Sequence, residues 1–308
     1  MTSIKTTTSI KRTSGTTIPR RSASKIRVTP YFWLIPAFAL LIFVVGYPIL
    51  QNIIASFTTV HNGGTAFVGF AQYVQLLRDP TFYSSVLLTI VWTVGVTALQ
   101  FFFGAVSALA ADRSSWFVRR VRPVLIIPWV LPGVVAANIW VVFYNDNGLI
   151  NKILTSIGLP TQQAWLADSN TAMIAVIVAA AWKGFPFYFL LLLAGLQSVP
   201  AETREAAKVD GAGSFQTLTR VVLPQMRAII VTSLVLGVIA TSNYFDGIYL
   251  MTGGGPSGST QTLPIWLYNT AFADFDFAKA SALSVIILLL VLVPVIVQLI
   301  AQRNRAIK

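Results

Sequence analysis

Residues 171–196 read TAMIAVIVAAAWKGFPFYFLLLLAGL and contain a single charged residue, Lys183. A helix crosses a bilayer with about 20 consecutive apolar residues, so this stretch is long enough to span one. At this length only a helix satisfies its own backbone hydrogen bonds in lipid, whereas a barrel strand needs about 9–11 alternating residues. The stretch therefore predicts a transmembrane helix and indicates an all-α membrane protein.

Other stretches of the chain share this length and apolar character. They are Tyr31–Ser56, Ser84–Ala111, Pro123–Tyr144, Ala228–Met251 and Phe277–Ala301. The 308 residues are 55% hydrophobic and only 10% charged, whereas a soluble domain carries about 25% charged residues. The sequence therefore predicts six transmembrane helices in all.

The distribution of basic residues predicts the orientation. If the N-terminus is cytoplasmic, most of the 22 Lys and Arg residues lie on the cytoplasmic side, in the N-terminal tail, the loops near 113–122 and 204–227, and the C-terminal end. Cytoplasmic loops of membrane proteins carry such an excess. We therefore expect both termini to be cytoplasmic. The net charge of +12 then reflects topology, and we expect no nucleic-acid partner.

The first 30 residues have a different composition from the rest. Seven Lys and Arg residues stand there among Ser and Thr, with few large apolar groups. Such a segment buries too little surface to fold. We predict a disordered basic cytoplasmic tail at 1–30 and a transmembrane domain at 31–308. The apolar run that follows the tail is too long for a cleaved signal peptide, so we expect it to remain as the first span.

Several classes of enzyme and metal protein are disfavoured by the sequence. There is no cysteine, which excludes disulfides, thiolate metal sites and cysteine nucleophiles, and His61 is the single histidine. The phosphate-binding pattern G-x-x-x-x-G-K-[ST], the G-x-S-x-G elbow and the H-E-x-x-H pattern do not occur. We therefore expect a non-catalytic chain that binds no metal or cofactor.

The loop at 198–225 departs from the apolar pattern. Pro200 suits a helix start, Glu202 and Glu205 favour its first turns, and Gly211 with Gly213 is expected to end it. A second short helix is predicted at about Ser214–Val222, after which Pro224 turns the chain back towards the bilayer. A helix with a small alanine face can dock in a protein groove. The alternative, an interfacial amphipathic helix, requires a larger apolar face with Lys and Arg flanks.

Fixed positions of this loop match a known pattern, E-A-A-x3-G-x9-I-x-L-P. The matching residues are Glu205, Ala206, Ala207, Gly211, Leu223 and Pro224, with Val221 in place of Ile. The loop resembles the cytoplasmic loop of ATP-binding-cassette (ABC) importer permeases. Four further segments, Trp182–Phe187, Leu196–Pro200, Asp210–Gly213 and Thr252–Pro256, resemble the sugar-type, maltose-permease-like branch. The resemblance covers about residues 30–305.

This resemblance implies a multi-subunit importer in a bacterial or archaeal inner membrane. Its expected partners are a second homologous permease in a heterodimer, two ATPase subunits that carry ATP and Mg, an extracytoplasmic solute-binding protein, and membrane lipid. The loop between spans four and five would be a cytoplasmic coupling helix, seated in a cleft of the ATPase. The implied cargo is a mono-, di- or short oligosaccharide, with glycerol-3-phosphate or a related polyol ester as the alternative.

A self-sufficient, ion-coupled secondary transporter is the alternative from another class. Such proteins carry acidic residues within spans and often broken helices in matched halves. The sequence shows neither feature clearly.

The resemblance also implies positions along the substrate path. Aligned through Gly-Phe-Pro and the later Gly-Gly-Pro turn, these are Gly184, Phe187, Gly237, Thr241 and Tyr244. We expect Thr241 and Tyr244 to share one helix face with Gly237, whose missing side chain would leave room for a sugar. The competing interpretation is that this stripe only packs against the partner permease. For Lys183 the competing interpretation is a structural lysine that is paired or reaches towards the membrane surface.

Overall fold

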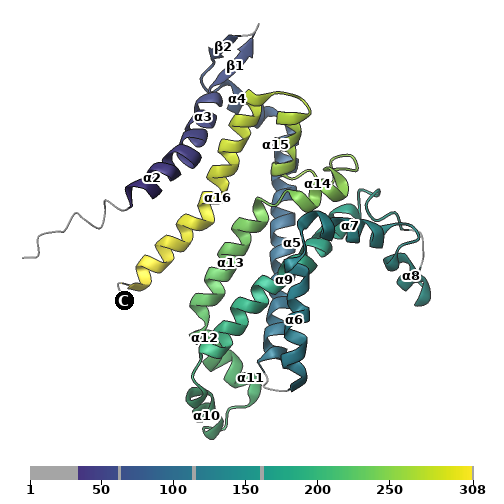
Figure 1. The fold of residues 1–308 in the computed structure, drawn as a ribbon, viewed down its shortest axis with the longest axis vertical. Helices are drawn as coiled ribbons and strands as arrows, with labels where there is room; N and C mark the ends of the chain where they lie inside the picture. The colour runs from purple at the N-terminus through teal and green to yellow at the C-terminus, as the bar shows by residue number, and fades with distance from the viewer. Residues whose placement is uncertain (1–33, 62–63, 113–115, 160–162, 307–308) are drawn as a thin grey trace, which may run out of the picture. The chain divides into compact units, whose positions relative to one another are not determined.

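The computed structural model of the chain describes residues 34–61, 64–112, 116–159 and 163–306 (Figure 1). The predicted tail at 1–30 lies outside the described residues. The chain divides into two units, Met1–Leu50 and Gln51–Lys308. Because the first unit ends inside a helix, the predicted boundary near residue 30 stays a prediction.

The first predicted span is helical throughout its described part. It consists of α2 (Ile35–Leu41), a π-helical turn η1 (Ile42–Gly46) and α3 (Tyr47–Ala55). Together they form an apolar helix long enough to cross a membrane. Phe43 in this helix is 74% exposed, as expected of an apolar side chain whose surroundings are lipid.

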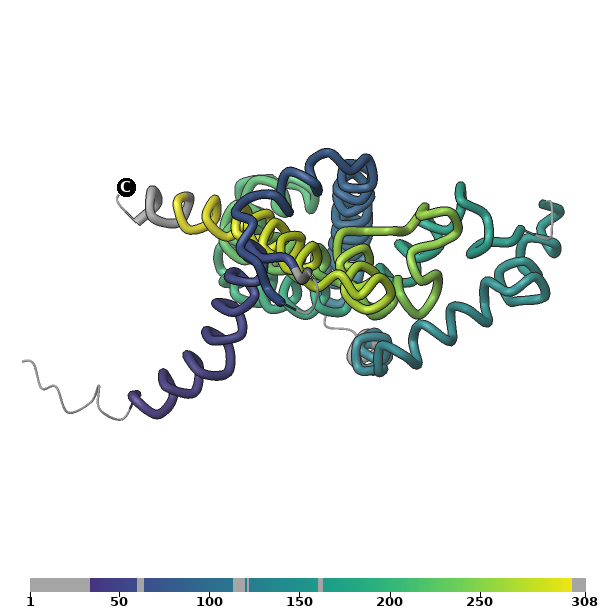
Figure 2. Tube along the Cα trace, turned by 90° about the horizontal axis from the view of Figure 1, so that it is seen from above, coloured from purple at the N-terminus to yellow at the C-terminus, as the bar shows by residue number. Residues whose placement is uncertain are grey.

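Three further predicted spans are single helices in the second unit. They are α5 (Pro80–Ala111), α9 (Ala172–Ser198) and α16 (Phe277–Ala306). Helices α5 and α9 pack along each other, and the fully buried Tyr188 and Phe189 lie in the core between the helices. Figures 1 and 2 both place α16 beside α13 (Arg227–Ser242), which it contacts.

The third predicted span is broken. Helix α6 (Trp116–Val130) ends before Leu131, and α7 (Gly133–Tyr144) starts after Pro132, at an angle of 99°. Pro132 has no backbone N–H and adopts an extended conformation with ψ 142°, and a proline also disfavours helix at the residue before it. The expectation of one uninterrupted helix over Pro123–Tyr144 is therefore wrong.

The fifth predicted span is broken as well. Helix α13 ends at Ser242, and α14 (Asp246–Thr252) follows a non-helical break. Before α13, the short elements α11 (Ser214–Thr217), η2 (Leu218–Val222) and α12 (Leu223–Gln225) lead into it with a bend of 70°. The bend falls at Met226, so Pro224 lies inside a helix rather than at the turn predicted for it.

The remaining elements lie in the loops. They are the antiparallel strands β1 (Thr58–His61) and β2 (Gly64–Phe67), and the helices α4 (Ala71–Arg78), α8 (Leu149–Ser156), α10 (Ala201–Val209) and α15 (Leu263–Phe272). Among the described residues, four helices can cross a membrane, or up to six when each bent pair counts as one span. The prediction of an all-α membrane protein is confirmed, with bends in the third and fifth spans.

Candidate functional site

Helix α10 has the termini that its sequence predicts. It starts directly after Pro200 and carries Glu202 in its first turn and Lys208 in its last, which suits the helix dipole. Gly211 follows the helix in the left-handed conformation, with φ +83°. The N–H of Ala212 donates to the carbonyl of Ala207 at 2.9 Å, and the N–H of Gly211 donates to that of Lys208 at 3.0 Å. These two bonds are those of a Schellman C-cap.

Gly213 has a different role from the one expected. It lies at the N-cap of α11, with φ −68° and ψ 166°, and its N–H donates to Oε1 of Gln216 at 3.2 Å. The expectation that both glycines end α10 is therefore wrong. Gly211 ends the first helix and Gly213 begins the next one, which produces the sharp turn between them.

The exposed surface of this loop combines apolar side chains with charged ones, among them Glu205. Glu205 and Ala206 are exposed, whereas Ala207 is buried. Val209 is 88% exposed and Phe215 is 76% exposed. We call Glu205, Ala206, Val209 and Phe215 the loop tip. Leu223 and Pro224, the last positions of the matching pattern, are exposed on α12.

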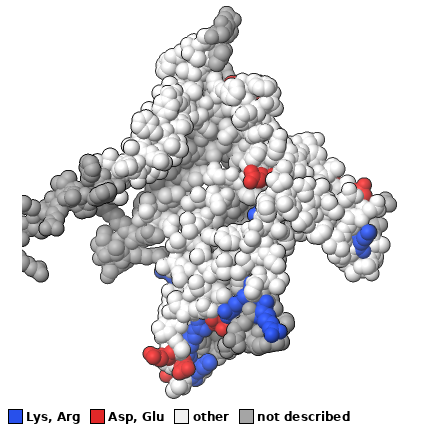
Figure 3. Space-filling model, in the orientation of Figure 1, with Lys and Arg blue, Asp and Glu red and all other residues white. Residues whose placement is uncertain are grey.

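Charged side chains gather at this end of the second unit. Figure 3 shows Lys, Arg, Asp and Glu concentrated around α10, whereas most of the remaining visible surface is uncharged. A charged surface belongs in water, and an uncharged apolar one belongs in lipid. The loop tip therefore projects into the aqueous phase, where a protein partner can reach it.

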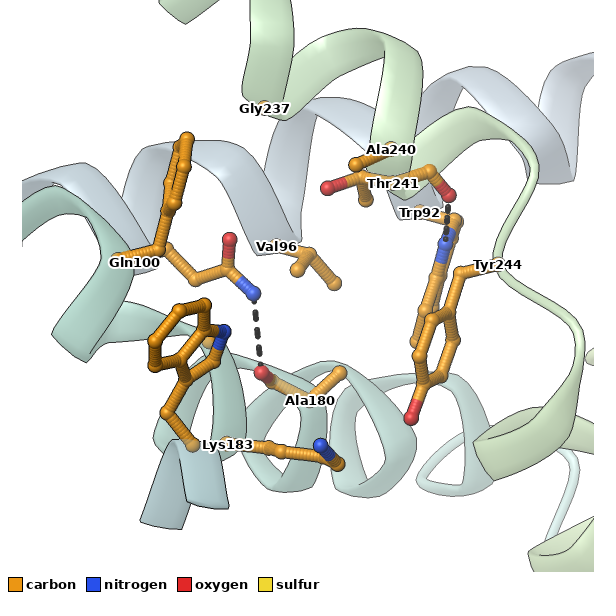
Figure 4. A pocket seen from close by; sticks show the side chains of 12 residues that line it. Trp92, Val96, Gln100, Ala180, Lys183, Gly237, Ala240, Thr241 and Tyr244 are labelled. Carbon is orange, nitrogen blue, oxygen red and sulfur yellow. Dashed lines mark hydrogen bonds between the residues drawn. The ribbon is translucent and has the colours of Figure 1, made fainter. Parts of the chain in front are cut away.

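A second feature is a cavity of about 220 Å³ between α5, α9 and α13 (Figure 4). It is lined by Trp92, Val96, Gln100, Trp129, Ala180, Lys183, Gly184, Phe187, Gly237, Ala240, Thr241 and Tyr244. All five positions carried over from the resemblance are in this set. The structure thus brings together residues that the alignment placed on two separate helices.

One end of the cavity is built around Trp92. Its indole Nε1 donates to the backbone carbonyl of Thr241 at 2.9 Å, and the ring of Tyr244 stacks on it with centroids 5.9 Å apart. Because α13 ends at Ser242, Tyr244 lies in the break rather than on the helix face of Thr241. The shared helix face expected for these two residues is therefore wrong, although both line the cavity.

The opposite end of the cavity explains Gly184. The Gln100 side-chain Nε2 donates to the carbonyl of Ala180 at 3.0 Å. A Cβ atom on Gly184 would overlap the amide of Gln100. Glycine at this position therefore lets a polar side chain of α5 enter the cavity wall.

The sequence of the chain also matches a known protein family. Residues 100–306 match the family described as binding-protein-dependent transport system inner membrane component. The chain belongs to this family. The resemblance inferred from the loop to a sugar-type ABC importer permease is thereby confirmed, and the chain is a multi-pass membrane protein.

Relatives of this family member include permeases of several transport systems. It is 33% identical to the trehalose/maltose transport system permease protein MalF of Thermococcus litoralis, over 71% of this chain and 74% of the relative. It is 34% identical to the sn-glycerol-3-phosphate transport system permease protein UgpA of Brucella abortus, over 84% of this chain and 89% of the relative. The probable ABC transporter permease protein YurN of Bacillus subtilis is 32% identical over 84% of this chain and 91% of its own length.

A solved structure supports the fold. The structure of a bacterial ABC transporter involved in the import of the acidic polysaccharide alginate superposes with a TM-score of 0.76 at 22% identity. The match covers 90% of this chain and 95% of the other. The chain therefore shares its fold with a chain of this transporter.

Lys183 of this binding-protein-dependent permease lines the cavity without an acid beside it. No Asp or Glu is among the lining residues. The described residues include the ion pairs Arg204–Asp112 and Lys279–Asp79, neither of which involves Lys183. Among the described residues, the expectation of a paired structural lysine therefore finds no support.

The described residues hold no group of three or more His, Asp or Glu side chains that could bind a metal ion. Permease components of ABC transporters are generally non-catalytic, which agrees with the absence of catalytic patterns in the sequence. Sequence reasoning missed Trp92 and Gln100 in the cavity wall. Their signal was available, because a glutamine and an indole N–H inside an apolar span both require hydrogen-bond partners.

Proposed function

We propose that this chain is the transmembrane permease subunit of an ABC importer that moves a carbohydrate into the cytoplasm. ATP is hydrolysed on partner subunits, and the chain itself is non-catalytic and binds no cofactor. The cavity between α5, α9 and α13 carries this proposal, because it joins aromatic rings to hydrogen-bonding groups within the membrane-spanning helices. A mono-, di- or short oligosaccharide needs both.

The chemistry of the cavity suits a sugar. The stacked rings of Trp92 and Tyr244 offer an apolar surface, and the side chains of Gln100, Thr241 and Tyr244 supply donors and acceptors. At about 220 Å³ the cavity is smaller than the roughly 300 Å³ at which ordinary ligand pockets begin. We therefore expect a second, homologous permease to complete the path in a heterodimer.

The names of relatives support a carbohydrate cargo. They include permeases for trehalose/maltose and for galactooligosaccharides. Others are permeases for sn-glycerol-3-phosphate and sulfoquinovosyl glycerol, which carry a negative charge. Lys183 favours such a charged polyol ester as the second candidate cargo, because a lysine within a membrane segment without a partner is a functional candidate.

The loop tip supports an ATPase partner. Phe215 and Val209 are exposed apolar groups beside the acid Glu205, a combination that fits a groove with a cationic rim. We infer from the basic loops that this side and both termini face the cytoplasm of a bacterial or archaeal cell. Two ATPase subunits would then act from the cytoplasm, and a solute-binding protein would deliver cargo from outside.

The test is uptake by the reconstituted transporter. The chain is purified together with the second permease and the ATPase that neighbouring genes encode, and the complex is placed in liposomes. The solute-binding protein is added with a panel of labelled sugars and polyol phosphates. We expect uptake only when ATP is present on the side of the liposome membrane that carries the ATPase. A complex with Glu205→Ala should hydrolyse ATP without moving cargo. Uptake by this chain alone, or uptake driven by an ion gradient without ATP, would show that it is a secondary transporter.

A further inference from the structure

Arg204 turns away from the loop tip although it belongs to the same helix. Its Nη1 donates to Oδ2 of Asp112 at 2.6 Å, and its Nη2 donates to the backbone carbonyl of Leu196. The Arg204 side chain is 26% exposed and that of Asp112 is 21% exposed. One guanidinium thus holds two separate groups at once, which its planar fork permits and a lysine ammonium does not reproduce.

The two acceptors mark the cytoplasmic ends of two transmembrane helices. Asp112 is the residue directly after α5, and Leu196 lies in the last turn of α9. These ends are packed together in one buried cluster that includes Ala111 and Leu196. Helix α6 joins the same point, because Nη2 of Arg122 donates to the carbonyl of Ala111 at 2.5 Å.

The same two helices form most of the cavity wall. Helix α5 contributes Trp92, Val96 and Gln100, and α9 contributes Ala180, Lys183, Gly184 and Phe187. The covalent connection from α9 to α10 is short and consists of Val199 and Pro200. α5 has no such direct connection to α10. Arg204 supplies a polar link between α10 and the end of α5 through its ion pair with Asp112.

We propose that Arg204 is a positioning residue that makes α10 move as one body with the cytoplasmic ends of α5 and α9. This inference rests on the proposed function, in which an ATPase displaces α10. A displacement of α10 is then passed to both walls of the cavity. Without the guanidinium, α10 can pivot about Val199 and Pro200 while α5 stays in place, and ATP hydrolysis no longer moves the cavity wall.

The molecule offers a matched control at the other end of α5. There Nζ of Lys279 contacts Oδ2 of Asp79 at 3.1 Å, with side chains 25% and 26% exposed. The two ion pairs flank the same helix and have similar exposure. Partly exposed ion pairs contribute little to stability, so loss of either pair is expected to leave assembly largely intact. The coupling of ATP hydrolysis to transport should depend on the Arg204–Asp112 pair and not on the Lys279–Asp79 pair.

The experiment uses the complete transporter in liposomes and measures cargo moved per ATP hydrolysed. Variants are Arg204→Asp, Asp112→Arg, the double exchange, and Arg204→Lys, beside the control exchange of Asp79 and Lys279. We expect each single Arg204-pair variant to lower the ratio about tenfold, within the usual range of coupling between sites. The double exchange and Arg204→Lys should each recover part of the loss, because both keep an ion pair and both lose the contact of Arg204 with the Leu196 carbonyl.

Several results would overturn the inference. One is an unchanged ratio in Arg204→Asp and Asp112→Arg. Another is an equal loss in the control pair. A third is a fall in the yield of assembled complex that accounts for the lost transport. If the charge-reversal variants fail to fold, Arg204→Lys still distinguishes a loss of coupling from a loss of assembly. If the wild-type complex moves no cargo with ATP, the proposed function fails first, and the inference fails with it.

Discussion

The hydroxyl of Tyr188 on α9 lies where a Cβ atom of Gly237 on α13 would have to stand. The two helices therefore cross with room for a hydrogen atom only. Tyr188 is fully buried, and the side chain of Thr97 on α5 interacts with its hydroxyl. The space left by the missing side chain of Gly237 is filled by this tyrosine, so the expectation that it leaves room for cargo is wrong on that side.

A first prediction follows from this crossing. Gly237→Ala should force α9 and α13 apart, and overpacking of this kind costs about 1–3 kcal/mol. We expect a lower thermal midpoint of the assembled complex and a lower yield. Tyr188→Phe alone should have a smaller effect, because it removes at most one hydrogen bond, to Thr97.

The control for this prediction is Gly46→Ala. Gly46 also lies in a membrane helix, but its Cβ would meet nothing closer than a carbonyl oxygen at 4.0 Å. The double variant Gly237→Ala/Tyr188→Phe should recover only part of the loss, because the ring carbon Cζ of Tyr188 remains 2.6 Å from the new Cβ. A wild-type midpoint for Gly237→Ala would show that the helices are not in close contact there.

A second prediction compares the two loop glycines. A Cβ would meet nothing within 4 Å at Gly211 or at Gly213, but only Gly211 has a positive φ, of +83°. A left-handed conformation costs an L-residue about 1–2 kcal/mol. Gly211→Ala should therefore loosen the C-cap of α10 and raise the rate of proteolytic cleavage in the loop, whereas Gly213→Ala should not.

Asparagine provides a graded check on this prediction, because it tolerates the left-handed conformation better than alanine. Gly211→Asn should be cleaved more slowly than Gly211→Ala. Equal cleavage rates for Gly211→Ala and Gly213→Ala would mean that the conformation of Gly211 is not what holds the loop.

The apolar spans could be predicted from the sequence, but their breaks could not. A proline does not reveal a break by itself, because Pro186 and Pro294 lie inside the unbroken helices α9 and α16. Pro132 interrupts its span because α7 leaves at 99° to pack elsewhere, against α14 among other helices. The direction of α7 is set by tertiary packing, which cannot be predicted from local hydropathy.

The cavity could be predicted only where a motif fixed the alignment. Gly184 and Phe187 were found through the Gly-Phe-Pro segment, but Trp92 and Gln100 belong to α5, which carries no recognised motif. Gln100 reaches Ala180 across the helix interface, a contact between residues far apart in the sequence. Periodicity identifies which face of a helix is apolar, but it does not identify the partner helix.

A third prediction concerns the thermal stability of the protein at low pH and the residue Asp79, which precedes the N-terminus of α5. Burial raises the pKa of Asp79, but hydrogen bonds from Thr81 and Lys279 oppose it and leave that pKa below its ordinary value. A carboxylate with a lowered pKa stabilises the fold above the pKa of the unfolded chain, and this contribution is lost as the pH falls through the folded pKa. We expect the thermal midpoint to fall below about pH 4 for this reason.

Two variants separate the contributions to this acid response. Asp79→Asn should be less stable than wild type at neutral pH and should lose part of the decline in acid. Lys279→Met should keep some of that decline, because the N–H of Thr81 still donates to Asp79 Oδ1 at 3.0 Å. If the thermal midpoint falls by the same amount at low pH in Asp79→Asn and in wild type, other carboxylates are responsible for the decrease.

The last prediction asks what Lys183 serves. Its side chain lines the cavity and has no acid among the other lining residues, so its counter-charge comes either from cargo or from the second permease. Lys183→Met removes the charge and keeps a long side chain. For a charged cargo we expect normal assembly and a roughly ten- to hundredfold loss of ATP-dependent uptake, since a hydrogen bond to a charged group contributes about 1.5–3 kcal/mol. Lys183→Arg should retain most uptake. A fall in complex yield would instead assign Lys183 to the permease interface, and unchanged uptake in Lys183→Met would leave the neutral sugar as cargo.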